Sequence, residues 1–298
     1  MKPNSRLTAR RAEAALVFNT LIWGSTFVVV KQALHDVSPI LFLALRFSLA
    51  SLALLLMFRG LWSGPRHPRR SLAGGAIAGA LLFSGYAFQT VGLQYTTAPK
   101  SAFLTGLTTA IVPVLGALAY RIRPRAMEIT GVAVATVGMA LMTLPSASVA
   151  INRGDLLTVG CAVCYAAHIL TLGHYSDTSF ELLSTSQIVV SAILAWSLFH
   201  WLETPHIRWS AGVWVAIGVT GLLATAVAFT FQSWAQKYTS STRTALIFTL
   251  EPVFAWVTSY LLTRETLSWR AAAGAGLILA GVLLVELKPL TPKLHSSE

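Results

Sequence analysis

Residues 88–102, FQTVGLQYTTAPKSA, return almost position by position at residues 231–245, as FQSWAQKYTSSTRTA. Phe88 thus corresponds to Phe231, and the offset between the two copies is close to half of the 298-residue chain. Similarity at half the chain length indicates an internal duplication. We therefore expect two structural units, residues 1–150 and residues 151–298.

The duplication extends beyond this stretch. The same offset relates two pairs of glycines, Gly131 with Gly274 and Gly138 with Gly281. Pro252, however, lies about one helical turn earlier than the offset from Pro113 would place it. We therefore expect one extra turn before the proline of the first copy.

The composition excludes a water-soluble protein. Apolar residues make up 55% of the chain, charged residues only 11%, and the mean hydropathy is +0.66. A typical soluble domain contains about 25% charged residues, so this chain has too little polar surface to face water. An intrinsically disordered protein is excluded as well, because such chains have low hydrophobicity.

Ten charge-poor stretches approach or exceed the length of about 20 residues that a helix needs to cross the hydrocarbon core. They are Ala14–Val30, Pro39–Phe58, Leu72–Gln94, Ser101–Tyr120, Ile129–Val149, Leu156–Ser176, Leu182–Leu202, Ser210–Ala235, Thr244–Thr263 and Ala271–Val285. Because lipid offers the backbone no hydrogen-bond partners, these stretches are predicted to be helices. The predicted fold class is an all-α integral membrane protein with ten transmembrane helices.

Five spans in each repeat are an odd number, so the two repeats must cross the membrane in opposite directions. Inverted repeats with a substrate site between them, near the middle of the membrane, are typical of secondary transporters. A duplication without transport is the alternative. We expect a transporter of a small-molecule substrate, with its central cavity between two inverted five-helix repeats.

The formal net charge of +11 would indicate nucleic-acid binding in a soluble protein. In a membrane protein the same charge reflects the enrichment of Lys and Arg in cytoplasmic connections. With the N-terminus inside, 15 of these residues fall in inner segments and 6 in outer segments, although the second half alone shows no bias. We expect a multi-pass protein of the bacterial cytoplasmic (inner) membrane, with cytoplasmic N- and C-termini. Its predicted partner is the lipid bilayer, and no nucleic acid is expected. No cleavable signal peptide is expected either.

Helical periodicity places aromatic and polar side chains on shared faces of five spans. The predicted substrate-binding residues are Trp23, Thr26, Tyr86, Thr105, Tyr165, His168 and Phe229. Rings with polar neighbours suit a substrate that has an apolar body and a polar head. The alternative is that the rings anchor the protein at the membrane interface and the hydroxyls serve helix packing. Gln89 and Gln232 lie near span ends, so they are expected at the interface.

Three ionisable side chains are singled out within predicted spans. Arg46 and Glu251 are the only full charges there, and each needs a partner or water. We favour a structural or coupling pair between them, and the alternative is that Arg46 binds a substrate carboxylate. His168 lies near the middle of its span. Its usual pKa near 6.5 suits a contact with the substrate or its coupling proton, and the alternative is a neutral histidine bonded within the bundle.

Proline and glycine positions predict how the helices bend and pack. Pro113 and Pro252 each remove a backbone hydrogen bond, so we expect helix kinks beside the cavity. Two seams of small residues are expected to allow close packing inside the bundle, Gly75 with Gly79 and Gly276 with Ala280. Packing within the bundle leaves the chain as a monomer or a weak homodimer.

The sequence contains no phosphate-loop, dinucleotide-binding or zinc-protease pattern, so no enzyme is predicted. Cys161, Cys164 and His168 share a helix face, which raises transport of a soft metal as an alternative. Three ligands on one helix form an incomplete site, however, so we predict no metal and no cofactor. Without an ATP-binding loop, uphill transport must use an ion gradient or the gradient of the substrate itself.

Four motifs together resemble those of one family. They are Trp23-Gly24-Ser25-Thr26-Phe27, Arg46-Phe47, Leu250-Glu251-Pro252-Val253-Phe254-Ala255, and Glu265 followed by Gly274, Ile278 and Gly281. With the ten spans and the repeat, nearly the whole chain resembles the EamA-type ten-helix exporters of the drug/metabolite transporter superfamily. The first repeat departs from the pattern, because its loop Tyr120–Arg125 lacks an acidic residue equivalent to Glu265.

The resemblance implies ten helices around a central cavity, with the third, fourth, eighth and ninth moving and the fifth and tenth at the periphery. It is closest in kind to bacterial exporters of amino acids, including aromatic ones, that work by alternating access. The alternative within transport is an exporter of drugs or quaternary organic cations, held by aromatic rings and a carboxylate. An alternative of another class is a non-transport membrane protein such as a lipid scramblase or a sensor.

Overall fold

The computed structural model of the chain describes residues 3–60, 67–96, 98–121, 124–144, 151–263 and 268–286. Within these ranges the regular structure is helical, apart from one isolated antiparallel bridge between Val37 and Ile207. The helices are α1 (Pro3–Ala33), α2 (Pro39–Phe58), α3 (Pro68–Gly92), α4 (Ala98–Gly106), α5 (Thr108–Tyr120), α6 (Ala126–Thr143), α7 (Arg153–His174), α8 (Phe180–Leu202), α9 (Ala211–Gly221), the π-helix η1 (Leu222–Val227), α10 (Ala228–Ala235), α11 (Ser241–Phe248), α12 (Glu251–Thr263) and α13 (Trp269–Glu286).

These helices make ten spans in the described part of the chain, because three spans are interrupted. The fourth span consists of α4 and α5, the eighth of α9, η1 and α10, and the ninth of α11 and α12. The ten-helix fold predicted from the sequence is confirmed. The predicted end of the fifth span at Val149 and the boundary between the repeats at residue 150 lie outside the described residues.

The surface of the bundle is apolar. Seven of the described spans are long and apolar enough to cross a membrane by themselves, and Trp269–Val285 is a shorter apolar helix. Large apolar side chains point outward, including those of Leu118, Trp201 and Leu261, which are 76%, 86% and 66% exposed. Such a surface is unfavourable in water but suits lipid tails, as expected for an integral membrane protein.

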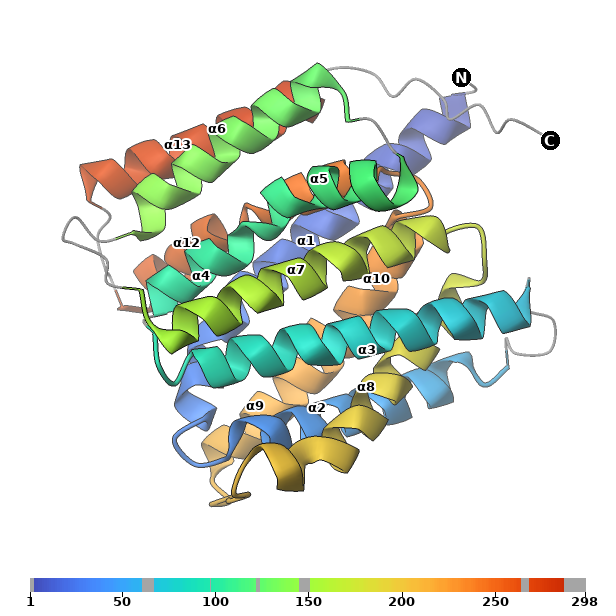
Figure 1. Cartoon of the computed structure of the whole chain (residues 1–298), viewed down its shortest axis with the longest axis vertical. Coiled ribbons are helices and arrows are strands. Elements are labelled where there is room, and N and C mark those ends of the chain that lie inside the picture. Colours follow the sequence, from blue (N-terminus) through green and yellow to red (C-terminus); the bar gives the residue numbers. More distant parts are fainter. Residues whose placement is uncertain are drawn as a thin grey trace.

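The fifth and tenth spans, α6 and α13, show the inversion of the two repeats. A Cβ atom added to Gly138 or Gly274 would lie 2.6 or 2.5 Å from the carbonyl oxygen of the other glycine. Gly131 and Gly281 face each other in the same way, at 2.8 and 2.6 Å, so no larger residue fits without movement. Residue numbers rise along α6 as those of their partners fall along α13, so these equivalent helices are antiparallel. Figure 1 shows them side by side at one edge of the bundle.

The two predicted seams of small residues differ in outcome. Gly75 and Gly79 lie against α8, as expected for packing inside the bundle. The prediction that Gly276 and Ala280 pack inside the bundle is wrong. No described atom lies within 4 Å of a Cβ built at Gly276, and Ala280 is exposed. The face of α13 that meets α6 carries instead the two glycines of the duplicated pattern, which are about two turns apart.

The interruptions of the fourth and ninth spans are equivalent in the duplication. One lies at Leu107 and the other at Thr249–Leu250, and the offset between the copies places Leu107 on Leu250. Pro252 lies in the first turn of α12, where a residue without a backbone N–H is tolerated. Pro113 lies well inside α5, beyond the first interruption. The positions of the breaks therefore follow the repeat, whereas the prolines do not.

Candidate functional site

A cavity of about 150 Å³ lies between the two repeats. All seven predicted substrate-binding residues line this cavity: Trp23, Thr26, Tyr86, Thr105, Tyr165, His168 and Phe229. Arg46, Glu251 and Pro252 line it as well, whereas Pro113 does not. An apolar cavity of about this size in another protein binds benzene, so the volume suits an aromatic or branched aliphatic group.

Aromatic rings from both repeats meet at the cavity. Trp23 of α1 lies against Phe229 of α10 and Phe248 of α11, with ring centroids 5.5 and 4.9 Å apart. Tyr86 of α3 lies 5.6 Å from Tyr165 of α7 and 6.3 Å from Phe229. These tilted and edge-to-face arrangements are favourable for aromatic pairs. The five rings form a continuous surface, which we call the aromatic wall.

Arg46 of α2 is held in place by the π-helix of the eighth span. Its Nε donates a hydrogen bond to Thr225 Oγ1 at 2.7 Å, and its Nη2 donates to Tyr86 Oη at 2.9 Å and to the Ala224 carbonyl at 3.2 Å. Trp23 Nε1 donates to the same carbonyl at 2.9 Å. A π-helix disturbs the regular backbone ladder, which explains how the Ala224 carbonyl accepts from two other helices. The guanidinium is thereby fixed on the cavity wall although Arg46 is 4% exposed.

The predicted pair between Arg46 and Glu251 is not formed. Among the described residues, no ion pair within 4.0 Å involves either side chain, and Glu251 makes no side-chain hydrogen bond. Arg46 binds neutral acceptors of α3 and η1 instead, whereas Glu251 lines the cavity from the first turn of α12. The two charges therefore face one cavity as separate groups.

His168 of α7 is hydrogen-bonded within the bundle and also lines the cavity. Its Nε2 is hydrogen-bonded to Gln187 Oε1 of α8 at 2.7 Å, and Gln187 Nε2 donates to Ser233 Oγ of α10 at 3.2 Å. In the described part of the chain, the other ring nitrogen of His168, Nδ1, has no hydrogen-bond partner. The imidazole also lies on the cavity wall, with its centroid 5.7 Å from the ring of Phe229. The sequence does not predict the bond between Gln187 and His168, because a single uncharged amide in an apolar span gives no indication of its partner.

Gln89 and Gln232 line the cavity, although their positions near span ends did not predict this. Gln232 is only 1% exposed. Gln89 Nε2 donates to Thr105 Oγ1 at 3.1 Å, and its Oε1 accepts a long bond from Tyr165 Oη at 3.5 Å. The cavity thus extends to the last turn of α3 and of α10, farther along these helices than expected.

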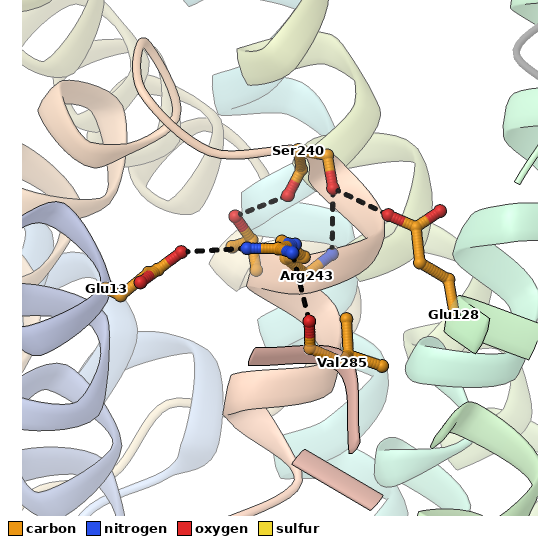
Figure 2. Close-up of polar contacts among 6 residues, drawn as sticks. Glu13, Glu128, Ser240, Arg243 and Val285 are labelled. Carbon is orange, nitrogen blue, oxygen red and sulfur yellow. Dashed lines mark hydrogen bonds and ion pairs between the residues drawn. The ribbon is translucent and has the colours of Figure 1, made fainter. Parts of the chain in front are cut away.

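A second, partly buried network joins four spans and includes residues of α1 and of the last turn of α13 (Figure 2). Arg243 of α11 donates from Nη1 to Glu13 Oε1 of α1 at 3.1 Å, and from Nη2 to the Val285 carbonyl of α13 at 3.0 Å. Ser240 accepts from the backbone N–H of Arg243 at 3.2 Å and donates to Glu128 Oε1 of α6 at 3.4 Å. We call these five residues the Arg243 network. Their association was not predicted, because Arg243 precedes the predicted ninth span.

Known proteins share this architecture. The model of the EamA-like transporter family matches residues 10–144 and again residues 152–287. An uncharacterized transporter of Archaeoglobus fulgidus is 34% identical to the chain, over 93% of the chain and 86% of the relative. A protein of Salmonella typhimurium named as a probable amino-acid metabolite efflux pump is 26% identical, over 89% of the chain and 91% of the relative.

A solved crystal structure has the same fold. It superposes with a TM-score of 0.77 at 18% sequence identity, covering 93% of this chain and 97% of the other. The two family matches together cover nearly the whole chain, in agreement with the duplicated ten-helix architecture. The chain therefore belongs to the EamA-like transporter family of multi-pass membrane proteins.

Proposed function

We propose that the protein exports amino acids with aromatic or other apolar side chains, together with related small metabolites, across the bacterial inner membrane. The observation that carries this proposal is the aromatic wall, which bounds a cavity of about 150 Å³ between two inverted repeats. An apolar side chain suits the rings, and the polar groups beside them suit an amino-acid head group.

The similarity to a Salmonella typhimurium protein named as a probable amino-acid metabolite efflux pump supports this substrate class. The arrangement also suits alternating access. The fourth and ninth spans are both broken beside the cavity, and discontinuous helices at a repeat interface are typical of carriers that expose one site to each side in turn.

An exporter of organic cations is the second candidate function. It is favoured by one observation, the Glu251 carboxylate on the same cavity as the aromatic wall. A carboxylate and ring faces together attract a quaternary ammonium group. Arg46 on that cavity disfavours a cation unless its charge is neutralised.

Transport by purified protein in liposomes tests the proposal. Vesicles are loaded with labelled phenylalanine, tyrosine, tryptophan, leucine or glutamate, and efflux is followed with and without a pH gradient. We expect movement of the aromatic amino acids and leucine above that in empty liposomes, and little movement of glutamate. Efflux of tetraphenylphosphonium without efflux of any amino acid would overturn the proposal in favour of the cation exporter.

A further inference from the structure

We propose that the cavity binds its amino acid as a zwitterion, with the carboxylate on Arg46 and the ammonium group on Glu251. This inference rests on the proposed function and adds to it the two residues that recognise the head group. It also assigns one charged contact to each repeat, because Arg46 belongs to the first and Glu251 to the second.

The guanidinium of Arg46 has hydrogen-bonding capacity left over. Thr225, Tyr86 and Ala224 accept from its Nε and Nη2. In the described part of the chain no acceptor is bound to Nη1, which carries two of the five N–H groups of an arginine. The side chain lines the cavity, and its carbon Cζ lies 4.5 Å from the centre of the Tyr86 ring. Arg46 is thus immobilised on one edge and open on another, as a fixed donor for a carboxylate would be.

The carboxylate of Glu251 likewise has unused hydrogen-bonding capacity, as an acceptor where Arg46 is a donor. None of the described residues donates a hydrogen bond to it, and no lysine, arginine or histidine among them lies within 4.0 Å. It lines the same cavity from the first turn of α12. A carboxylate in such a place needs water, a proton or a cation to offset its charge. A primary ammonium group supplies that charge and three N–H donors.

The Arg46 guanidinium and the Glu251 carboxylate together restrict the charge of the ligand more than either does alone. A cation without a carboxylate neutralises Glu251 but brings a positive charge into the cavity with Arg46. An anion without an amine neutralises Arg46 but brings a negative charge into the cavity with Glu251. A zwitterion offsets both charges at once and adds no net charge to a site within the membrane. Its side chain is then left for the aromatic wall.

The decisive experiment compares three ligands that share one ring on the purified wild-type protein. L-phenylalanine carries both charges at pH 7, phenethylamine lacks the carboxylate, and 3-phenylpropionate lacks the amine. Leucine, isoamylamine and 4-methylpentanoate form a second set for an aliphatic pocket. Binding is measured by titration calorimetry in detergent. We expect the amino acid of at least one set to bind at least tenfold more tightly than both of its analogues, because each analogue loses one charge-assisted contact.

Two variants then test which residue binds the ammonium group of the ligand and which binds its carboxylate. Glu251→Gln is expected to weaken the amino acid and the amine at least tenfold and to leave the carboxylic acid unchanged. Arg46→Gln is expected to weaken the amino acid and the carboxylic acid and to spare the amine. Asp177→Asn is the matched control, because Asp177 pairs with Arg70 on an exposed surface and does not line the cavity. If Arg46→Gln does not fold, the wild-type comparison and Glu251→Gln still decide.

The outcomes separate this inference from the proposed function. If an amino acid is transported but one of its analogues binds within threefold of it, the zwitterion inference is overturned and amino-acid export stands. The inference also fails if Glu251→Gln weakens the amino acid and the carboxylic acid equally. If the liposomes move no amino acid, both fail together.

Discussion

Glu13 near the start of α1 and Arg243 at the start of α11 form a buried ion pair, with Oε1 and Nη1 3.1 Å apart and side chains only 15% and 5% exposed. The sequence distance between them is 230 residues, and the pair joins the first span to the ninth. Arg243 also binds the carbonyl of Val285, so its side chain links the N-terminal half of α1 to the last turn of α13 (Figure 2).

Removal of one partner of this pair is expected to destabilise the protein. Glu13→Gln removes the carboxylate that lies 3.1 Å from the buried Arg243 guanidinium, and removal of one partner of such a pair costs about 3 kcal/mol. The thermal midpoint in detergent, measured by intrinsic fluorescence, should fall by several degrees. Asp177→Asn is the control, because its pair with Arg70 has side chains 47% and 45% exposed and is expected to matter by less than about 1 kcal/mol. Equal shifts in the two variants would contradict the burial argument.

The glycine contact between α6 and α13 gives a prediction with an internal control. Gly138→Ala places a Cβ 2.6 Å from the carbonyl oxygen of Gly274, so the helices must separate, at a cost of about 1 to 3 kcal/mol. Gly276→Ala meets no described atom within 4 Å and gains helix propensity, so it should be neutral or stabilising by up to about 1 kcal/mol. Thermal unfolding of the two variants in the same detergent checks the difference. A stable Gly138→Ala would show that the helices have room to move apart.

His168 is predicted to contact the substrate or its coupling proton. His168→Ala should then lower the initial transport rate at least tenfold and alter the dependence of the rate on pH, because the ionisable imidazole is removed. His200→Ala, on an exposed position near the end of α8, should change neither quantity. Transport by His168→Ala with an unchanged rate and pH profile would leave only the structural bond to Gln187.

The orientation in the membrane is open to direct labelling. Lys2 and Lys293 lie outside the described residues, but the Arg243 side chain links the helices next to them in the chain, α1 and α13. Single cysteines at these two positions, in a chain whose native Cys161 and Cys164 are replaced by alanine, should react with an impermeant maleimide only after the cytoplasmic side is opened. Reaction of the two positions from opposite sides would contradict the predicted topology.

Much of the fold follows from simple features of the sequence. The odd number of apolar spans in each copy predicts inversion, and the antiparallel contact of Gly138 with Gly274 shows it. The cavity residues on α1, α3, α7 and α10 follow from helical periodicity, because a polar group one turn from a ring is costly on a lipid-facing surface. The six residues selected in this way line one cavity, together with Thr105 of α4.

The partners of the charges were beyond prediction from the sequence. Arg46 binds the Ala224 carbonyl because η1 is a π-helix, and the composition of Leu222–Val227 does not distinguish it from an ordinary apolar helix. The sequence favours pairing of Arg46 with Glu251 only because it reveals no neutral acceptor for either. Arg243 was missed for a related reason, since its burial depends on α1 and α13, which lie far away in the sequence.

The reciprocal contact of α6 with α13 also restricts how the two halves of the gene can diverge. Each glycine leaves the space that the opposite backbone occupies, so a side chain acquired in one half must be accommodated by a shift of the other. A substitution at one of these positions is therefore expected to change what its partner position tolerates. The fusion of the two copies into one chain keeps such paired sites under joint selection, and a library that randomises Gly138 and Gly274 together should recover compensating combinations that single substitutions cannot reach.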